Sequence, residues 1–148
     1  MKVFLAGAVS SAKESQLKKY YIYQKCLNEF FKDICLTTPD DICEYRDECI
    51  KNNPNFQKIQ IDEVMVKYDL QKVRESDLIV CDLSELSTGM GLELGVAHEC
   101  NKKVIFFYDK NSHVSNMLNG AFVNSKFIEY ENVKDLEEKL KQNLENFL

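Results

Sequence analysis

The chain has 148 residues, of which 45% are hydrophobic and 29% charged, as in one globular domain with a substantial core. Its formal net charge of −5 argues against a nucleic-acid partner, which calls for a basic surface. No apolar stretch approaches the ~20 residues of a membrane span, so we expect no membrane partner either.

Six cysteines raise the question of disulfide bonds or a metal site. Their spacing contains no CxxC pair, and only two histidines accompany them, so they match no zinc pattern. The apolar run after Met1 and Lys2 is too short for the core of a signal peptide. We therefore expect reduced cysteines in a cytoplasmic protein, and we predict neither a metal nor a cofactor.

Apolar runs and helical periods alternate along the chain. The predicted elements, in chain order, are a strand at Lys2–Ala6, a helix at Gln16–Phe31, a strand at Asp33–Thr38, a long surface loop at 39–58, a helix at Ile59–Glu75, a strand at Asp77–Leu83, a glycine-containing loop leading into a helix with Glu93 near its start, a strand at Lys103–Tyr108, a short helix at Val114–Leu118, a strand at Lys126–Tyr130 and a helix at Val133–Phe147 capped by Asn132.

This alternation predicts an α/β fold, a single domain with a five-stranded, doubly wound parallel sheet of the flavodoxin or Rossmann-like type. Ligands of such folds bind outside the carboxyl ends of the strands, where the strand order reverses. In the flavodoxin-like order, the loops at that point are Gly7–Ser15 and Ser84–Met90. Asp82 ends the central strand and is expected to tie down the second of these loops.

Glu93 is the first unusual carboxylate. Three of the five glycines, Gly89, Gly91 and Gly95, surround it, and its i+3, i+4 and i+7 neighbours are apolar. In the first turn of a helix, unpaired N–H groups would keep its carboxylate ionised, which suits a nucleophile or a base. Spacing alone leaves equally open that Glu93 faces solvent in a favourable first turn.

Asp69 is the second unusual carboxylate. Its neighbours at i−4, i−3 and i+4 of the predicted helix are Met65, Val66 and Val73, so it also lies on an apolar stripe. Alone, it can equally be a paired structural acid. If both carboxylates converge on one cleft, they provide the acid and the nucleophile of retaining glycosyl chemistry.

The stretch SDLIVCDLSELSTGMGLELGVAHECNKKVIFFY resembles the nucleoside 2-deoxyribosyltransferase superfamily. Its hallmark is an apolar strand that ends in an acid and is followed by a serine–glycine–glutamate segment. Ser87, Gly89, Gly91 and Glu93 match that segment, whereas Leu86 replaces its usual proline. The segment SNMLNGA also fits, and the resemblance spans nearly the whole chain, so it implies one such domain over residues 1–148.

The resemblance implies that Glu93 is the nucleophile, which attacks C1′ of a ribosyl or deoxyribosyl group. It implies that Asp69 helps the base to leave, either as a proton donor or by holding the base or the sugar. The covalent glycosyl-enzyme would then pass its sugar to water or to another base.

Ser87 separates two branches of the superfamily. Transferases that act on free nucleosides carry an acid there, whereas the nucleoside 5′-monophosphate N-hydrolases carry serine. A carboxylate ~4 Å from a phosphate would cost about 4 kcal/mol at an effective dielectric of about 20, and serine removes that repulsion. Ser115 matches a second serine, which reaches the phosphate from the neighbouring subunit. The resemblance therefore favours a homodimeric nucleoside 5′-monophosphate N-glycosidase.

Substrate binding by several further residues follows from the resemblance. The implied set is Phe4, Gly7, Val9, Ser10, Ser87, Gly89, Gly91, Ser115 and Met117, with Ser115 and Met117 completing the neighbour's site. Phe4 replaces a tyrosine whose hydroxyl lies near the sugar, which leaves room for a 2′-OH. Ser10 replaces an arginine, and Arg46 of the predicted loop 39–58 could supply a cation instead.

Two other functions stay open. The chain could be a nucleoside 2′-deoxyribosyltransferase that exchanges bases between free deoxynucleosides. It could also be a non-catalytic module that binds a nucleotide.

Overall fold

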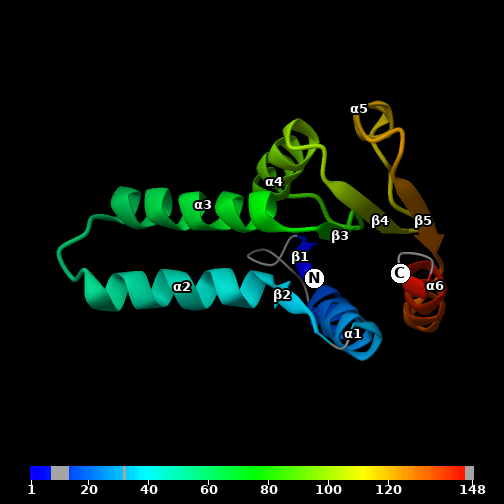
Figure 1. Cartoon of the computed structure of the whole chain (residues 1–148), viewed down its shortest axis with the longest axis horizontal. Coiled ribbons are helices and arrows are strands. Elements are labelled where there is room, and N and C mark those ends of the chain that lie inside the picture. Colours follow the sequence, from blue (N-terminus) through cyan, green and yellow to red (C-terminus); the bar gives the residue numbers. More distant parts are fainter. Residues whose placement is uncertain (8–13, 32, 146–148) are drawn as a thin grey trace.

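The computed structural model describes residues 1–7, 14–31 and 33–145, and it has the predicted α/β architecture (Figure 1). Its elements are β1 (Lys2–Ala6), α1 (Glu14–Phe30), β2 (Cys35–Thr37), α2 (Pro39–Asn52), α3 (Lys58–Glu75), β3 (Leu78–Asp82), α4 (Thr88–Glu99), β4 (Lys103–Asp109), α5 (Asn116–Ala121), β5 (Lys126–Tyr130) and α6 (Val133–Glu145).

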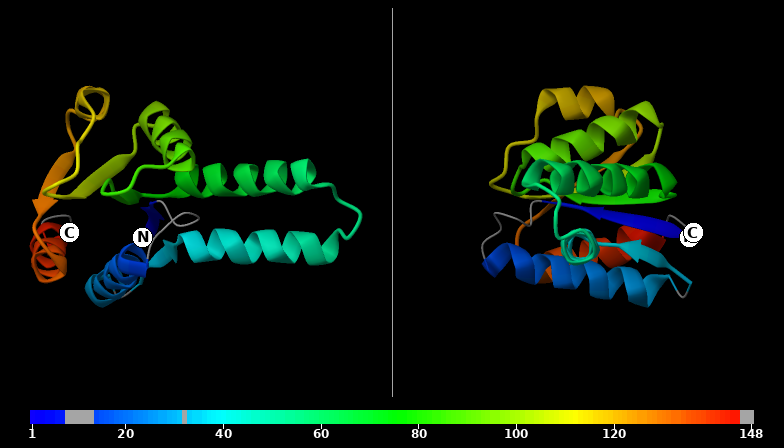
Figure 2. Two further views of the ribbon diagram at one scale, coloured as in Figure 1. Left: turned by 180° about the vertical axis from the view of Figure 1, so that it is seen from behind. Right: turned by 90° about the vertical axis from the view of Figure 1, so that its left-hand side faces the viewer.

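The five strands form one parallel sheet in the order β2-β1-β3-β4-β5. This is the flavodoxin-like order, and the direction of winding reverses between β1 and β3, as predicted. Helices α1 and α6 cover one face of the sheet, and α3, α4 and α5 lie over the other (Figure 2). The single-domain doubly wound fold is therefore confirmed.

The apolar strands explain this layering. Val3 and Leu5 of β1 pack into the core beneath α1 and α6, whereas Phe4 and Ala6 pack into the core beneath α3 and α4. Such alternation is the two-residue period of a strand that is covered on both faces. All five residues of β3 are buried, which explains the nearly continuous apolar run in its sequence.

The prediction of a long loop at 39–58 is wrong, because most of that segment is helix α2. Thr38 and Asp41 form a capping box: Thr38 Oγ1 accepts from Asp41 N at 3.4 Å, and Asp41 Oδ2 accepts from Thr38 N at 2.6 Å. Pro39 occupies the first helical turn, where proline is well tolerated. No residue of α2 is buried, so its sequence has no strong apolar period.

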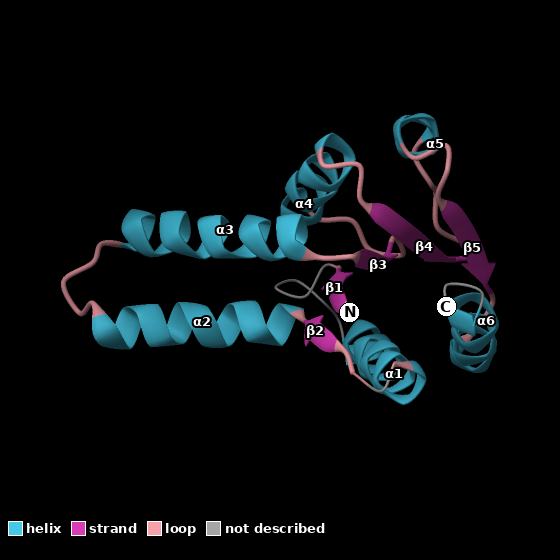
Figure 3. Cartoon of the chain, in the orientation of Figure 1, coloured by secondary structure: helices cyan, strands magenta, loops and turns pink. Residues whose placement is uncertain are grey.

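Helices α2 and α3 form a hairpin that extends away from the sheet (Figure 3). The stacked rings of Tyr45 and Tyr68, with centroids 3.8 Å apart, join the two helices. Arg46 lies on α2, where its guanidinium pairs with Asp47 at 2.9 Å. The sequence placed Arg46 in a loop, and the structure places it in a helix.

Most other predicted boundaries agree with the structure within about two residues, the usual uncertainty of helix ends. The short helix predicted to end before Gly120 instead starts at Asn116 and runs through Gly120. The predicted cap of the last helix is confirmed, since Asn132 Oδ1 accepts from Lys134 N at 3.0 Å and Asp135 N at 3.1 Å. The predicted end of that helix at Phe147 lies outside the described residues.

All six cysteines are free in the structure. None of the helices that the structure describes is long and apolar enough to cross a membrane. Within the same residues, no group of three or more histidine, cysteine or acidic side chains is arranged to hold a metal ion.

Candidate active site

The fold brings Asp69 and Glu93 together. Asp69 comes from α3 and Glu93 from α4, two helices that pack against each other over the same face of the sheet. Their carboxyl groups are in hydrogen-bonding contact, and both side chains are partly buried. Across the part of the chain that the structure describes, Asp69 Oδ1 and Glu93 Oε2 are buried and accept no hydrogen bond.

This contact requires a shared proton, because two carboxylates cannot hydrogen-bond each other when both are ionised. Burial raises the pKa of Glu93 to about 8, and the nearby charge of Asp69 and the hydrogen bond to it act in the same direction. Burial also raises the pKa of Asp69, while the hydrogen bond from Glu93 lowers it. At neutral pH the buried pair therefore retains one proton.

The sequence predicts an ionised Glu93 in the first turn of a helix. The structure differs in both respects. Helix α4 already begins at Thr88, before both glycines, so Glu93 lies in its second turn. The field of a helix N-terminus falls off within the first turn, and burial dominates beyond it. Gly89 and Gly91 are helical residues, and no glycine in the described segments has a positive φ.

At Gly89 and Gly91, the absence of a side chain leaves the backbone of α4 exposed. A Cβ at Gly89 would approach Ser87 Oγ at 4.0 Å, and one at Gly91 would meet nothing within 4 Å. A ligand or a second chain can therefore come close to the backbone of α4 there. Gly95 is equally open and lies on the same helix face as Gly91, one turn further along.

Ser87 is the N-cap of α4, and its Oγ accepts from Met90 N at 3.1 Å. A hydroxyl that accepts one hydrogen bond still has its own proton to donate. The first N–H groups of α4 lie at the same end of the helix as this hydroxyl, and a helix N-terminus favours an anion. Ser87 can thus take part in holding a phosphate.

Beneath Glu93 lies an apolar layer. Cys81 of β3 is fully buried and contacts Met90 through sulfur atoms 3.5 Å apart. Burial raises the pKa of the Cys81 thiol, and the nearby charge of Glu93 raises it further. Phe4 belongs to the same apolar cluster and is 2% exposed, so almost none of its ring is open to a ligand.

Gly7 follows β1 at the carboxyl edge of the sheet. A Cβ at Gly7 would overlap the hydroxyl of Tyr20 from α1, so a larger residue at this position would require the Tyr20 ring to move. Of the remaining predicted binding residues in this loop, Val9 and Ser10 lie outside the described residues.

Asp82 is a completely buried carboxylate at the end of β3. It accepts from Tyr23 Oη at 3.0 Å, from Tyr130 Oη at 3.1 Å and from Ser84 N at 2.8 Å. The last bond confirms the prediction that Asp82 ties down the following loop. The two tyrosine partners were missed, because α1 and β5 meet Asp82 only in the folded chain.

Ser115 and Met117 lie at the start of α5, away from β1. Ser115 is the N-cap, with Oγ accepting from Met117 N at 3.2 Å, and Met117 is 84% exposed. A groove of about 340 Å³ separates α4 from α5, and both Ser87 and Met117 line it. The structure therefore places Met117 on an open surface that continues to the N-terminus of α4.

Comparison with known proteins provides one curated relative. The chain is 33% identical over 82 residues to the 5-hydroxymethyl-dUMP N-hydrolase of Tetraodon nigroviridis. The match covers 53% of this chain and 55% of that protein, so the chain spans about half the length of the curated relative it matches. No family profile matches the chain.

Two solved structures cover nearly the whole chain. The CMP N-glycosidase of Clostridium botulinum has a TM-score of 0.66 at 21% identity, over 96% of this chain and 99% of that one. The 2-deoxyribosyltransferase of Bacillus psychrosaccharolyticus has a TM-score of 0.64 at 18% identity, over 95% and 96%. The predicted resemblance to the nucleoside 2-deoxyribosyltransferase superfamily is confirmed. At these identities the solved structures establish the fold.

The raised pKa of Glu93 makes stability depend on pH. An unfolded glutamate titrates near 4.5, so between about pH 4.5 and 8 the folded protein holds more protons than the unfolded chain. The free energy of unfolding should then fall as the pH rises through this window, by up to about 1.4 kcal/mol per pH unit. Urea titrations of the protein and of Glu93→Gln measure this difference. Parallel pH dependences of the two proteins would contradict the raised pKa.

Proposed function

We propose that the chain is an N-glycosidase that hydrolyses the bond between base and sugar in a ribo- or 2′-deoxyribonucleoside 5′-monophosphate. The observation that carries the proposal is the hydrogen-bonded carboxyl pair of Asp69 and Glu93. The names of two relatives, a nucleotide N-hydrolase and a CMP N-glycosidase, support it.

In the proposed reaction, the shared proton of the pair has two uses. Glu93 must lose a proton before it can attack, and the departing base must gain one. Asp69, which accepts the hydrogen bond from Glu93, passes this proton to the base. As Glu93 attacks C1′, the C1′–N bond breaks, a C1′–O bond to Glu93 forms, and the neutral base leaves.

The second step restores the pair. Asp69, now ionised, takes a proton from a water molecule whose oxygen attacks C1′. The ester bond to Glu93 breaks, the sugar phosphate leaves with a new hydroxyl group, and the proton returns to the two carboxyl groups. Two inversions at C1′ give overall retention, which is the expected outcome for two close carboxyl groups.

The phosphate is assigned to Ser87 and the N-terminus of α4. The Ser87 hydroxyl has its proton available, and the first N–H groups of α4 favour an anion. The open backbone at Gly89 and Gly91 lets a phosphate approach closely.

We further propose that the active form is a homodimer. The groove between α4 and α5 is almost entirely apolar, and Leu86 at its border is 62% exposed. A second copy packed there would cover Leu86 and Met117, and would bring its own Ser115 and Met117 towards Ser87. A cytoplasmic location is supported by the six free cysteines.

Replacing the nucleophile tests the reaction. The protein should release free base from at least one of CMP, dCMP, dGMP and 5-hydroxymethyl-dUMP, as measured by liquid chromatography. Glu93→Ala should lower this rate by about 1,000-fold or more. Glu99→Ala, an exposed acid at the end of the same helix, should leave it unchanged.

The other outcomes point to the two alternatives. Base exchange between free deoxynucleosides, with no hydrolysis of any monophosphate, would identify a transferase. Nucleotide binding without release of base, unaffected by Glu93→Ala, would identify a non-catalytic module.

Replacing Ser87 tests the phosphate assignment. Ser87→Asp should lower kcat/KM for the monophosphate by about 1,000-fold, because a carboxylate ~4 Å from the phosphate costs about 4 kcal/mol. Ser87→Ala, which removes the hydrogen bond to the phosphate and the N-cap bond to Met90 N, should cost about tenfold. The corresponding free nucleoside should not be disfavoured by Ser87→Asp. Equal losses for nucleotide and nucleoside would contradict a phosphate at this position.

A further inference from the structure

The side chain of Ser84 joins two loops at the carboxyl edge of the sheet. Ser84 lies in the loop between β3 and α4, three positions before Ser87. Its Oγ accepts from Asp109 N at 2.9 Å, and Asp109 is the last residue of β4. One hydroxyl therefore fastens the loop that ends at Ser87 to the start of the loop between β4 and α5.

The direction of the hydrogen bonds through Ser84 is fixed. Tyr130 Oη donates its only proton to Asp82 Oδ2 at 3.1 Å, and it also lies 2.7 Å from Ser84 Oγ. The Ser84 hydroxyl must then be the donor in this second bond. Burial and the charge of Asp82 raise the pKa of the Tyr130 phenol, so the phenol keeps its proton. A single chain of hydrogen bonds therefore runs from Asp109 N through Ser84 and Tyr130 to Asp82.

The loop after β4 is itself a closed turn. Asp109 Oδ1 accepts from Asn111 N at 2.9 Å and from Asn111 Nδ2 at 3.0 Å, and Asp109 O accepts from Ser112 N at 2.8 Å. Ser112 Oγ also donates to Ser84 O, at 3.5 Å. Ser115, the N-cap of α5, comes three positions later. A shift of Ser84 would therefore be transmitted along this turn towards Ser115.

We propose that Ser84 is a positioning residue for the substrate phosphate. Its hydroxyl holds Ser87 and the N-terminus of α4 in a fixed position relative to the segment that carries Ser115. The inference rests on the proposed function, in which Ser87 contacts the phosphate and a second copy brings its own Ser115 towards it. In this role Ser84 acts through the two other serines, and the carboxyl pair that breaks the glycosidic bond is unaffected by its loss.

Ser84→Ala tests this role by removing the hydroxyl. KM for the nucleoside 5′-monophosphate that the parent hydrolyses should rise about tenfold, because a shifted Ser87 loses its hydrogen bond to the phosphate, and kcat should stay close to that of the parent. Calorimetric titration with ribose 5-phosphate, which has no base to release, should show about tenfold weaker binding. Ser84→Thr, which keeps a hydroxyl on Cβ, should restore both values.

Tyr130→Phe is a second variant, and it leaves the Ser84 side chain unchanged. It removes the acceptor of the Ser84 proton, so it should change KM and ribose 5-phosphate binding in the same direction as Ser84→Ala. Its effect should be smaller, because Asp109 N still donates to Ser84 Oγ. This variant carries the test if circular dichroism shows that Ser84→Ala does not fold.

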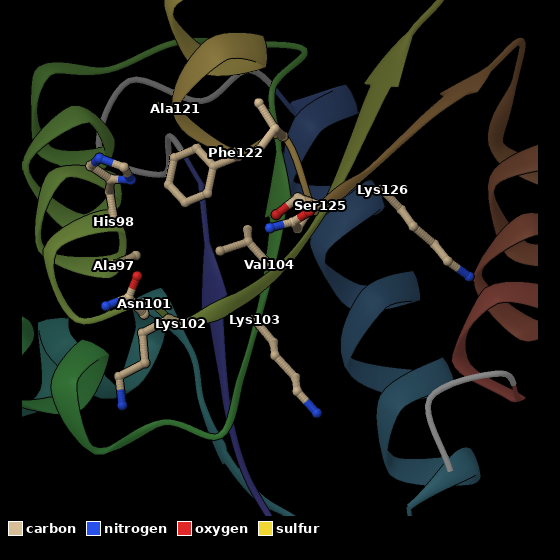
Figure 4. A pocket seen from close by; sticks show the side chains of 12 residues that line it. Ala97, His98, Asn101, Lys102, Lys103, Val104, Ala121, Phe122, Ser125 and Lys126 are labelled. Carbon is tan, nitrogen blue, oxygen red and sulfur yellow. The ribbon is translucent and has the colours of Figure 1, made fainter.

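Two matched controls lie at the opposite, amino edge of the sheet. Ser76→Ala removes a buried hydroxyl that donates to Val73 O at 2.7 Å, so it also costs one side-chain hydrogen bond. Ser125→Ala removes a half-buried hydroxyl in the turn before β5, within a hollow of about 550 Å³ (Figure 4). Both variants should keep the KM and the ribose 5-phosphate affinity of the parent.

A double-mutant cycle shows whether Ser84 acts through Ser87. In the Ser87→Ala background, Ser84→Ala should raise KM by a smaller factor than in the parent, because the hydrogen bond that it displaces is already absent.

Three results would overturn the proposal. The first is a KM and a ribose 5-phosphate affinity that Ser84→Ala and Tyr130→Phe leave unchanged. The second is an equal loss in Ser76→Ala, which would mean that reduced stability alone weakens binding. The third is the same effect of Ser84→Ala with and without the Ser87 hydroxyl. A parent protein that neither releases base nor binds ribose 5-phosphate would instead overturn the proposed function, and this inference with it.

Discussion

Two carboxyl groups share one proton where α3 and α4 meet, and the proposed chemistry depends on that contact. Separated and exposed, Asp69 and Glu93 would both be ionised at neutral pH, and neither could supply a proton to a departing base. Burial raises both pKa values and leaves one proton on the pair. In the proposed mechanism the pair supplies both the proton and the nucleophile, and substrate binding needs only to move the proton from Glu93 through Asp69 to the base.

The sheet keeps this pair in place from both of its faces. On one face, Val73 of α3 and Leu94 of α4 belong to the apolar core over β3, which fixes the two helices relative to each other. On the other face, Asp82 receives hydrogen bonds from Tyr23 and Tyr130 and also holds Ser84 N. The loop from β3 to α4, which ends at Ser87, is thus anchored to α1 and β5. Loss of Asp82 would leave three donors without this acceptor, and two of them are hydroxyls of buried tyrosines, which is costly.

The sequence predicts those parts of the structure that its local pattern encodes. Buried strands such as β3 and β4 are continuous apolar runs, and their alternation with helices predicts the doubly wound parallel sheet. Helix α2 escaped prediction because it buries no residue, although Thr38 and Asp41 carried a capping signal. The proton that the pair retains was missed for another reason. The pKa of Glu93 depends on Asp69, which is 24 positions earlier in the chain and becomes a neighbour only through folding.

The central claim is that Glu93 forms a covalent bond to the sugar. Its most direct test is the intact mass of the protein after incubation with a 2′-deoxy-2′-fluoro nucleoside 5′-monophosphate, in which the fluorine slows breakdown of a glycosyl-enzyme. The account predicts a mass increase equal to one fluorinated sugar phosphate, located on Glu93 by peptide mapping and absent in Glu93→Gln. Release of base without any adduct, or an adduct on another residue, would contradict it.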